Sequence, residues 1–344
     1  MSSADQPFAW GIVGCGWVVR DYVAPALAAT GTVAALCDPD AEALAATAPG
    51  AAHYADLDAF LRHPGLDAVY VATPNHLHAA HVAAVAEAGL PVLCEKPMAR
   101  TAVEAETMIE AVHRAGVPYA TAFDQRFHPA HVALRRLVAH GALGTVTCVR
   151  IHYACWTPAD WAPDALYRDN WRVDPERAGG GALIDLAPHG LDLTQLLLGE
   201  PIVEVAALTQ ERVFDYPVDD GAVLVGRTAS GALLSHTVAY NCPDAFPRRR
   251  LEVIGTEARA LAVNTMGQTP GGTLTLTHAD GREEAVPFDA ERSPFEAQAA
   301  AFVHAVRSGE PFPYGPERDL HTMRLLDAAV QSRPVRVDPE PVTA

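Results

Sequence analysis

The sequence predicts two structural parts: an N-terminal α/β domain with a parallel sheet and a C-terminal α+β domain with an open, mostly antiparallel sheet. Short apolar runs alternate with helix-length segments through about residue 125, and this alternation is typical of βαβ units. From Thr145 onward, segments of period-two hydrophobicity follow one another across glycine turns, which indicates hairpins. With 344 residues, the chain is long enough for two domains and a large core. We therefore divide it into residues 1–125 and 126–344.

Composition and charge narrow the class of protein. A content of 49% hydrophobic and 19% charged residues is that of a soluble globular protein. The net charge of −17 argues against nucleic acid and anionic membranes as partners, which leaves small polar molecules. No apolar run approaches the roughly 20 residues that span a bilayer, and the first seven residues lack the features of a secretory signal. Six cysteines without a Cys-x-x-Cys pair favour reduced thiols, so we expect a cytoplasmic protein.

The first glycine turn predicts a phosphate-binding site. Residues 8–13 form a short apolar run that indicates a buried strand, and Gly14-Cys15-Gly16 follows it directly. A helix should come next, so the backbone at Gly14 and Gly16 and the helix start at Trp17 and Val18 can meet a pyrophosphate. The third glycine of the Gly-x-Gly-x-x-Gly pattern would fall at Val19. A plain strand-to-helix turn therefore stays open as an alternative.

The second strand, at residues 32–38, predicts the cofactor. It ends in Asp38, at roughly the spacing where a carboxylate binds the ribose hydroxyls of a dinucleotide. No Arg or Lys lies between Asp38 and Arg62, so a 2′-phosphate would face Asp38 and Asp40 without a cationic partner. We therefore predict NAD rather than NADP.

The turn after the next strand should border the same crevice, because open parallel sheets bind ligands outside the carboxyl ends of their strands. This strand, at residues 68–72, is followed by Thr73, Asn75 and His78, which we expect at the cofactor. His76, His78 and His81 suggest a metal site. No neighbouring Cys or carboxylate completes a ligand set, and one helical face cannot present all three, so we expect no metal.

Glu95 and Lys96 follow the strand at residues 91–94, again at a carboxyl end that faces the predicted crevice. A lysine there can bind a substrate hydroxyl and lower its pKa, or act as an acid. The alternative is a solvated strand end. A further strand is expected at residues 118–122, and helices at residues 41–46, 56–62, 78–88, 102–115 and 131–140.

The second part is expected to form one sheet that carries helices on one face and leaves the other for a partner. Its strands are predicted at residues 145–153, 202–213, 220–228, 232–240, 249–255, 258–263 and 272–277. Residues 155–177 form a long loop rich in tryptophan, and loops of this length tend to be functional lids. Helices at residues 295–306 and 317–329 are expected to pack back on the body.

Residues 179–193 place three polar groups in an apolar segment. If the segment is helical, Asp185, His189 and Asp192 lie on one stripe, because residues three and four apart share a face. A carboxylate one turn from an imidazole can fix its tautomer and hold its charged form, as a proton-transferring histidine requires. The alternative is a satisfied core network in which Asp192 anchors a neighbour. Pro188 should kink the helix or mark its first turn.

Four motifs, in order along nearly the whole chain, resemble the Gfo/Idh/MocA oxidoreductases. They are Gly11-Ile12-Val13-Gly14-Cys15-Gly16, Val71-Ala72-Thr73-Pro74-Asn75-His76-Leu77-His78, Glu95-Lys96-Pro97, and Gly179-Gly180-Gly181 with Asp185 and His189. The resemblance implies that residues 1–125 form a Rossmann domain that binds NAD(P). It implies that residues 126–344 bind substrate and support a homo-oligomer, a dimer or tetramer, through their sheet. It also implies that Lys96, Asp185 and His189 are catalytic and line the substrate pocket.

The resemblance extends to other site residues. It places Arg126 near the nicotinamide and substrate. The other residues expected to bind substrate are Tyr153, Trp171 and Arg172. Glu95 and Lys96 are also expected to bind the cofactor. Two residues depart from the family pattern: Ala187 stands where Asp-x-Gly-x-His has Gly, and Asp124 stands where many members have Asn. An extra carboxylate would favour a cationic group on the substrate, as in an amino sugar or aminocyclitol. A surface Asp is the alternative.

These features predict reversible oxidation of a secondary alcohol on a sugar, cyclitol or amino-sugar-like substrate. His189 would take the hydroxyl proton as hydride passes to NAD, Asp185 would orient and charge the imidazole, and Lys96 would steady the alkoxide. One alternative is an internal-redox glycosidase or epimerase with tightly bound NAD. The other is a regulator that senses NAD and a sugar without turnover.

Overall fold

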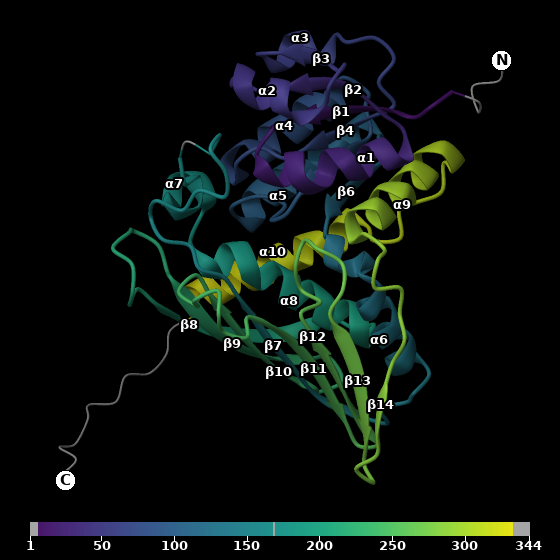
Figure 1. Cartoon of the computed structure of the whole chain (residues 1–344), viewed down its shortest axis with the longest axis vertical. Coiled ribbons are helices and arrows are strands. Elements are labelled where there is room, and N and C mark those ends of the chain that lie inside the picture. The colour runs from purple at the N-terminus through teal and green to yellow at the C-terminus, as the bar shows by residue number, and fades with distance from the viewer. Residues whose placement is uncertain (1–5, 168, 333–344) are drawn as a thin grey trace.

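The computed structural model describes residues 6–167 and 169–332, which contain two β-sheets. Figure 1 shows the smaller sheet in the upper part of the molecule, the larger one in the lower part, and helix α8 (Ala182–Leu198) between them. The predicted fold class, an α/β part followed by an α+β part, is confirmed.

The first sheet has six parallel strands in the order β3-β2-β1-β4-β5-β6. Helices cover both faces, which explains why its strands are almost continuously apolar. Two hydrophobic clusters result. Trp10 and Ile12 share one cluster with buried side chains of α1, and Val69 and Val71 share the other with buried side chains of α4 and α5. The strands are β1 (Ala9–Val13), β2 (Thr32–Cys37), β3 (Ala52–Tyr54), β4 (Ala68–Val71), β5 (Val92–Glu95) and β6 (Tyr119–Ala122). The short strand β3 is absent from the sequence prediction.

The helices of this part begin where the sequence provides caps. Asp40, Asp56 and Thr101 accept hydrogen bonds from backbone N–H groups at the starts of α2, α3 and α5. The predicted helix after the glycine turn exists, but a π-helical turn at Val19–Val23 precedes its α-helical part. The helices are α1 (Ala24–Thr30), α2 (Ala41–Thr47), α3 (Leu57–Leu61), α4 (Asn75–Glu87) and α5 (Ala102–Ala115), and a 3₁₀ turn at Asp124–Phe127 leads to α6 (Pro129–Ala139).

The second sheet has eight strands in the order β14-β13-β12-β11-β7-β10-β9-β8. Only β7 and β10 pair in parallel, so the predicted mostly antiparallel sheet is confirmed. Strand β8 ends earlier than predicted because Asp220 Oδ2 accepts hydrogen bonds from the N–H groups of Arg212, Val213 and Phe214, which turns the chain away. The strands are β7 (Val146–Ala154), β8 (Ile202–Gln210), β9 (Gly221–Thr228), β10 (Leu233–Ala239), β11 (Arg249–Gly255), β12 (Ala258–Val263), β13 (Thr273–His278) and β14 (Glu283–Ala285).

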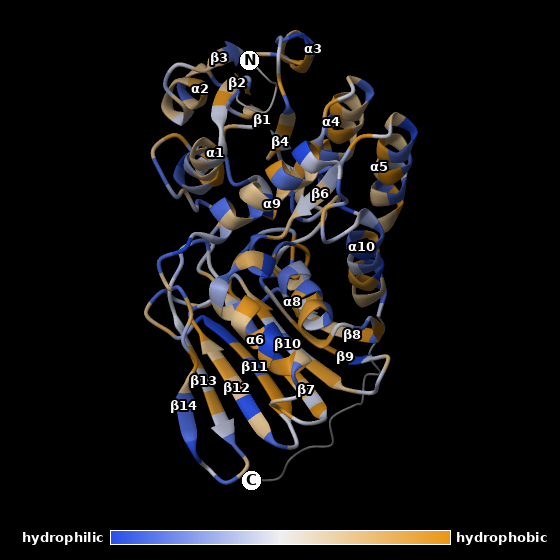
Figure 2. Ribbon diagram, turned by 90° about the vertical axis from the view of Figure 1, so that its right-hand side faces the viewer, coloured by the Kyte–Doolittle hydropathy of each residue, from blue (hydrophilic) through white to orange (hydrophobic). Residues whose placement is uncertain are grey.

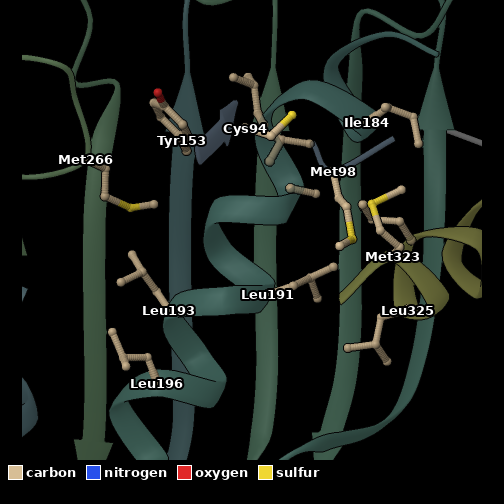
Figure 3. Packing of buried hydrophobic residues seen from close by; sticks show 14 of the residues in the cluster. Cys94, Met98, Tyr153, Ile184, Leu191, Leu193, Leu196, Met266, Met323 and Leu325 are labelled. Carbon is tan, nitrogen blue, oxygen red and sulfur yellow. The ribbon is translucent and has the colours of Figure 1, made fainter. Parts of the chain in front are cut away.

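Helix α8 packs on one face of this sheet, mainly over β10 and β7. Figure 3 shows Leu191, Leu193 and Leu196 of this helix among the buried side chains of the core. Gly190 lies so close to β10 that a Cβ atom there would be 2.9 Å from His236 Nδ1. Pro188 lies within the helix, in its second turn rather than its first. The short strand β14, which sequence reasoning missed, forms a hydrophilic edge to the sheet (Figure 2), and polar edge strands resist pairing with other chains.

The last two helices return to the body of the molecule. Helix α9 (Pro294–Ser308) packs against α1. Nearby, the ring of Phe302 stacks 6.0 Å from that of Trp10 on β1, and the ring of Phe295 stacks 5.7 Å from that of Tyr22 in the π-helical turn. Helix α10 (Pro316–Gln331) packs between α5 and α8 and also contacts β8. Within the described residues, none of the helices combines the length and hydrophobicity needed to cross a membrane.

Candidate active site

Two adjoining cavities lie at the carboxyl ends of the first sheet's strands. The glycine-turn cavity, of about 570 Å³, is lined by Gly14, Gly16 and Asp38. The lysine cavity, of about 300 Å³, is lined by Lys96, Asp185 and His189. The two share four lining residues, Trp17, Ala72, Thr73 and Trp171. An elongated ligand can therefore extend from one cavity into the other.

The glycine-turn cavity fits a dinucleotide. Gly14 has a φ of +94°, and a Cβ atom there would lie 2.6 Å from the Ala72 carbonyl oxygen, so only glycine suits this turn. Gly16 also lines the cavity, and a Cβ atom there would meet no protein atom within 4 Å. Asp38 Oδ2 accepts a hydrogen bond from the N–H of Cys15 at 2.7 Å, and Oδ1 accepts one from Asp40 at 2.9 Å. These bonds hold the carboxylate against the cavity, where the sequence places the ribose hydroxyls.

The predicted cofactor residues of the turn after β4 serve partly to fix the turn itself. Asn75 Nδ2 donates to the Ala178 carbonyl oxygen at 2.9 Å. The ring nitrogens of His78 lie 2.9 Å from the Pro97 carbonyl oxygen and 2.8 Å from that of Thr73, and burial lowers the pKa of His78 to about 4. Thr73, Asn75, His78, Val18 and Glu95 all line the lysine cavity. Their contact with a cofactor stays a prediction.

His76 and His81 line the glycine-turn cavity, whereas His78 lines the lysine cavity. In the part of the chain that the structure describes, no three His, Cys, Asp or Glu side chains gather closely enough to hold a metal ion.

An ion pair joins the two parts of the chain in the lysine cavity. Lys96 Nζ lies 2.7 Å from Asp185 Oδ1 and also donates to the Asp185 carbonyl oxygen at 2.9 Å. Tyr240 donates its hydroxyl to Asp185 Oδ2 at 2.8 Å, and Arg172 Nε lies 4.0 Å from the same oxygen. Burial alone would raise the pKa of Asp185, but Lys96 and Arg172 outweigh it and hold that pKa well below its usual value. Asp185 is therefore ionised throughout the physiological range.

His189 lines the same cavity as an uncharged imidazole. Its ring packs edge-on against Tyr153 at 5.4 Å and Phe123 at 6.1 Å between centroids. Burial and then the Lys96 ammonium lower the pKa of His189 well below its usual value, and the opposing effect of Asp185 is smaller.

Asp185 does not orient the imidazole in the way that the sequence predicts. Nδ1 of His189 is buried and has no hydrogen-bond partner among the described residues. Both oxygens of Asp185 instead accept hydrogen bonds from Lys96 and Tyr240. The expectation that Asp185 orients His189 is therefore wrong, because Lys96 and Tyr240 occupy both oxygens of its carboxylate. The charge of Asp185 does favour the imidazolium of His189, but less than burial disfavours it.

The expectation that Arg126 contacts substrate is also wrong. Its side chain is fully buried away from both cavities, where Nε and Nη2 donate to Asp192 at 2.9 and 2.8 Å and Nη2 also donates to Asp319. Arg318 adds a hydrogen bond from Nε to Asp192 at 3.3 Å. Asp192 is thus the anchor that the alternative interpretation foresaw, and this cluster holds the 3₁₀ turn, α8 and α10 together.

Asp124 is a buried wall of the lysine cavity rather than a surface residue. Burial and then the neighbouring Glu95 carboxylate raise the pKa of Asp124 to about 7. Burial also raises the pKa of Glu95, which accepts a hydrogen bond from the Tyr70 hydroxyl at 2.6 Å. A charged Glu95 thus makes Asp124 harder to ionise.

The tryptophan-rich loop contributes walls to both cavities, as expected for a loop with a role at the site. Trp156, Trp161, Trp171 and Arg172 line the lysine cavity. The Arg172 guanidinium lies over the ring of Trp171 at 4.6 Å and donates to the Tyr167 hydroxyl at 3.0 Å. Contacts of Trp161 with Trp17 and of Asp164 with Arg20 fasten the loop to the helix after the glycine turn.

Sequence reasoning missed several residues of the lysine cavity region, among them Tyr240, Arg249 and Gln268. Tyr240 directly follows β10, Arg249 begins β11, and Gln268 lies in the loop between β12 and β13, where no local motif marks them. Pairing of β11 with β7, which places Arg249 opposite Tyr153, is the signal that would have found Arg249.

The fold and the two connected cavities are those of a dinucleotide-binding oxidoreductase. Residues 8–123 match the model of the GFO_IDH_MocA oxidoreductase family with its NAD-binding Rossmann fold, and residues 131–261 match the GFO/IDH/MocA C-terminal domain. The chain belongs to the Gfo/Idh/MocA oxidoreductase family.

Named relatives of this chain act on sugars. It is 32% identical over 312 residues to 1,5-anhydro-D-fructose reductase of Ensifer adhaerens, covering 89% of this chain and 90% of the relative. It is 32% identical to an NADP⁺-dependent D-xylose 1-dehydrogenase of Haloferax volcanii, covering 94% and 96%. A levoglucosan dehydrogenase solved with NADH and levoglucosan superposes with a TM-score of 0.82 at 26% identity, covering 95% and 97%.

Proposed function

We propose that this protein uses NAD to oxidise, reversibly, a secondary alcohol of a sugar or cyclitol in the lysine cavity. The observation that carries the proposal is that Lys96, Asp185 and His189 line one cavity, which meets the glycine-turn cavity at Trp17 and Thr73. The sugar-acting relatives support the substrate class.

Lys96 is suited to stabilise the alkoxide that develops during oxidation. Its ammonium has three donors, two of which bind Asp185, so one stays available for a substrate oxygen. Lys96 is the only lysine in the sequence, and Arg is used at every other position of the Lys and Arg count. A compact ammonium with rotatable donors differs from a planar guanidinium, which supports a specific role for lysine here.

His189 is suited to take the hydroxyl proton because its imidazole is uncharged before reaction. Asp185 lies one turn away on α8, and its charge favours the imidazolium as it forms. A bound nicotinamide supplies the acceptor for the hydride that leaves the same carbon.

NAD is the cofactor that the glycine-turn cavity favours. Arg20 and Arg177 line this cavity, but Asp164 and Asp169 pair with them. Among the described residues, a 2′-phosphate would therefore meet Asp38 and Asp40 without a cation that lacks an acidic partner. Among the similar proteins, the H. volcanii relative is named for NADP⁺, so assays with both cofactors are needed.

The first test is a panel of sugars, cyclitols and amino sugars assayed with NAD and NADP by nicotinamide absorbance. We expect turnover with NAD, and Lys96→Ala should lower kcat/KM by about 10²–10³-fold because the alkoxide loses its charged donor. Thermal unfolding and NAD binding of the variant serve as controls for folding. Unchanged saturation and rate in Lys96→Ala would show that Lys96 is merely a solvated strand end. Tightly held cofactor without a net absorbance change would favour the internal-redox alternative.

We also propose that the chain forms a homo-oligomer through the outer face of its second sheet. Helices cover the other face, whereas the large apolar side chains Val223, Val225 and Leu233 are 44–52% exposed on neighbouring strands. Light scattering should give a multiple of the 36.5 kDa chain mass, and a monomer at micromolar concentration would refute this proposal.

A further inference from the structure

Arg249 lies in the lysine cavity, one aromatic ring away from His189. It begins β11 directly opposite Tyr153 of β7, and residues paired in this way share a face of the sheet. The Arg249 guanidinium lies 6.0 Å from the Tyr153 ring centroid, and the Tyr153 ring contacts His189. Arg249, Tyr153 and His189 all line the cavity.

The charge of Arg249 has no counter-charge within the described residues. The other basic groups of the cavity wall each have an acidic neighbour, because Asp185 lies beside Lys96 and Arg172 and Asp244 pairs with Arg248. The Arg249 guanidinium makes neither an ion pair nor a hydrogen bond to any residue that the structure describes, and its Nε is fully buried. A guanidinium that lines a cavity without a protein counter-charge can pair with an anionic ligand there.

Gly267 makes the space that the guanidinium occupies. A Cβ atom at Gly267 would lie 1.9 Å from Arg249 Nη1 and 2.7 Å from Cζ. Gly267 has no positive φ, so space rather than backbone conformation requires glycine here. The guanidinium therefore packs against bare backbone, which fixes its position in the cavity wall.

The remaining acidic groups of the cavity do not neutralise Arg249. Glu95 ends β5 and Asp124 follows β6 in the first sheet, whereas Arg249 belongs to the second sheet. Burial disfavours the ionised form of both carboxyls. A ligand that spans the cavity would thus meet a free cation at its second-sheet end.

We propose that Arg249 binds a carboxylate of the substrate, which makes the substrate a sugar acid. A planar guanidinium without a protein partner matches a carboxylate through two parallel hydrogen bonds. This inference rests on the proposed function: the CH–OH group still loses a hydride to NAD and a proton to His189, which yields a ketone, NADH and one proton.

The test compares hexuronates with the matching neutral aldoses in wild type and in Arg249→Gln, with NAD at saturation. We expect kcat/KM for the hexuronate to exceed that for the aldose in wild type. Arg249→Gln should lower the hexuronate value by about 10²-fold and the aldose value by no more than about threefold, because only the carboxylate loses a charge-assisted pair. Arg250→Gln is the matched control, since Arg250 is the next residue of β11, is exposed and does not line the cavity. It should leave both values unchanged.

A second variant tests the position of the guanidinium without removing its charge. Gly267→Ala should displace Arg249 and reproduce the selective loss for the hexuronate, with NAD affinity unchanged. Equal losses for both substrates in Arg249→Gln would overturn the inference, because Arg249 would then bind hydroxyl groups. Wild type that oxidises aldoses but no hexuronate would also overturn it while the proposed function stands. Failure with every sugar would count against the proposed function itself.

Discussion

Replacing His189 by Ala is expected to slow hydride transfer by about 10²–10⁴-fold, which is the usual contribution of a positioned proton acceptor. NAD affinity should change by no more than a few-fold, because His189 lines the lysine cavity and not the glycine-turn cavity. Single-turnover formation of NADH measures the first quantity, and titration of tryptophan fluorescence with NAD measures the second, since Trp17 and Trp171 line both cavities.

His152→Ala is the matched control for this variant. His152 precedes Tyr153 on β7 and lies outside the lysine cavity, so its loss should leave hydride transfer unchanged. Retained turnover in His189→Ala would refute His189 as the proton acceptor. It would shift the role to another titratable group of the same cavity, such as Lys96 or Asp124.

Replacing Arg126 by Met is expected to destabilise the protein by about 3–5 kcal/mol, the cost of breaking a buried ion pair by removing one partner. The carboxylates of Asp192 and Asp319 are fully buried. In the variant, Arg318 is the remaining ion-pair partner among the described residues, and it pairs with Asp192. Thermal and urea unfolding measure the loss. Arg136→Met on the exposed side of α6 is the control and should have little effect.

A double variant separates the buried charge from the packing of the Arg126 side chain. Arg126→Met with Asp319→Asn removes the carboxylate that Arg126→Met leaves without a cation in the part of the chain that the structure describes, so it should be more stable than Arg126→Met alone. A double variant that is equally or less stable would show that the cluster acts through shape rather than through charge.

The arrangement of the site follows from rules that apply to each strand separately. Ligands bind at the carboxyl ends of parallel strands, and this rule alone places Gly14, Asp38, Thr73 and Lys96 at one crevice. The helical spacing of Asp185 and His189 then puts both on the side of α8 that faces Lys96. The same rule applies to Asp124 at the end of β6, and a stricter use of it would have predicted its burial.

The partner of each charged group could not be predicted in this way. Arg126 belongs to a turn that the family pattern places near the substrate, yet its partner Asp319 lies 193 residues further along the chain. The Asp185 carboxylate could accept a hydrogen bond from His189 or from Lys96. Its side-chain direction depends on Tyr240, which follows a strand distant in the sequence. Such choices depend on how helices and sheets pack, which no local pattern encodes.

The return of α9 to α1 has a consequence for biosynthesis. Trp10 and Tyr22 are made near the start of translation, but Phe302 and Phe295, which cover them, leave the ribosome only near its end. The nascent N-terminal sheet must therefore wait with an uncovered aromatic surface, which makes it a natural client for chaperones. A fragment that stops near residue 125 should for the same reason aggregate rather than fold as an independent nucleotide-binding unit.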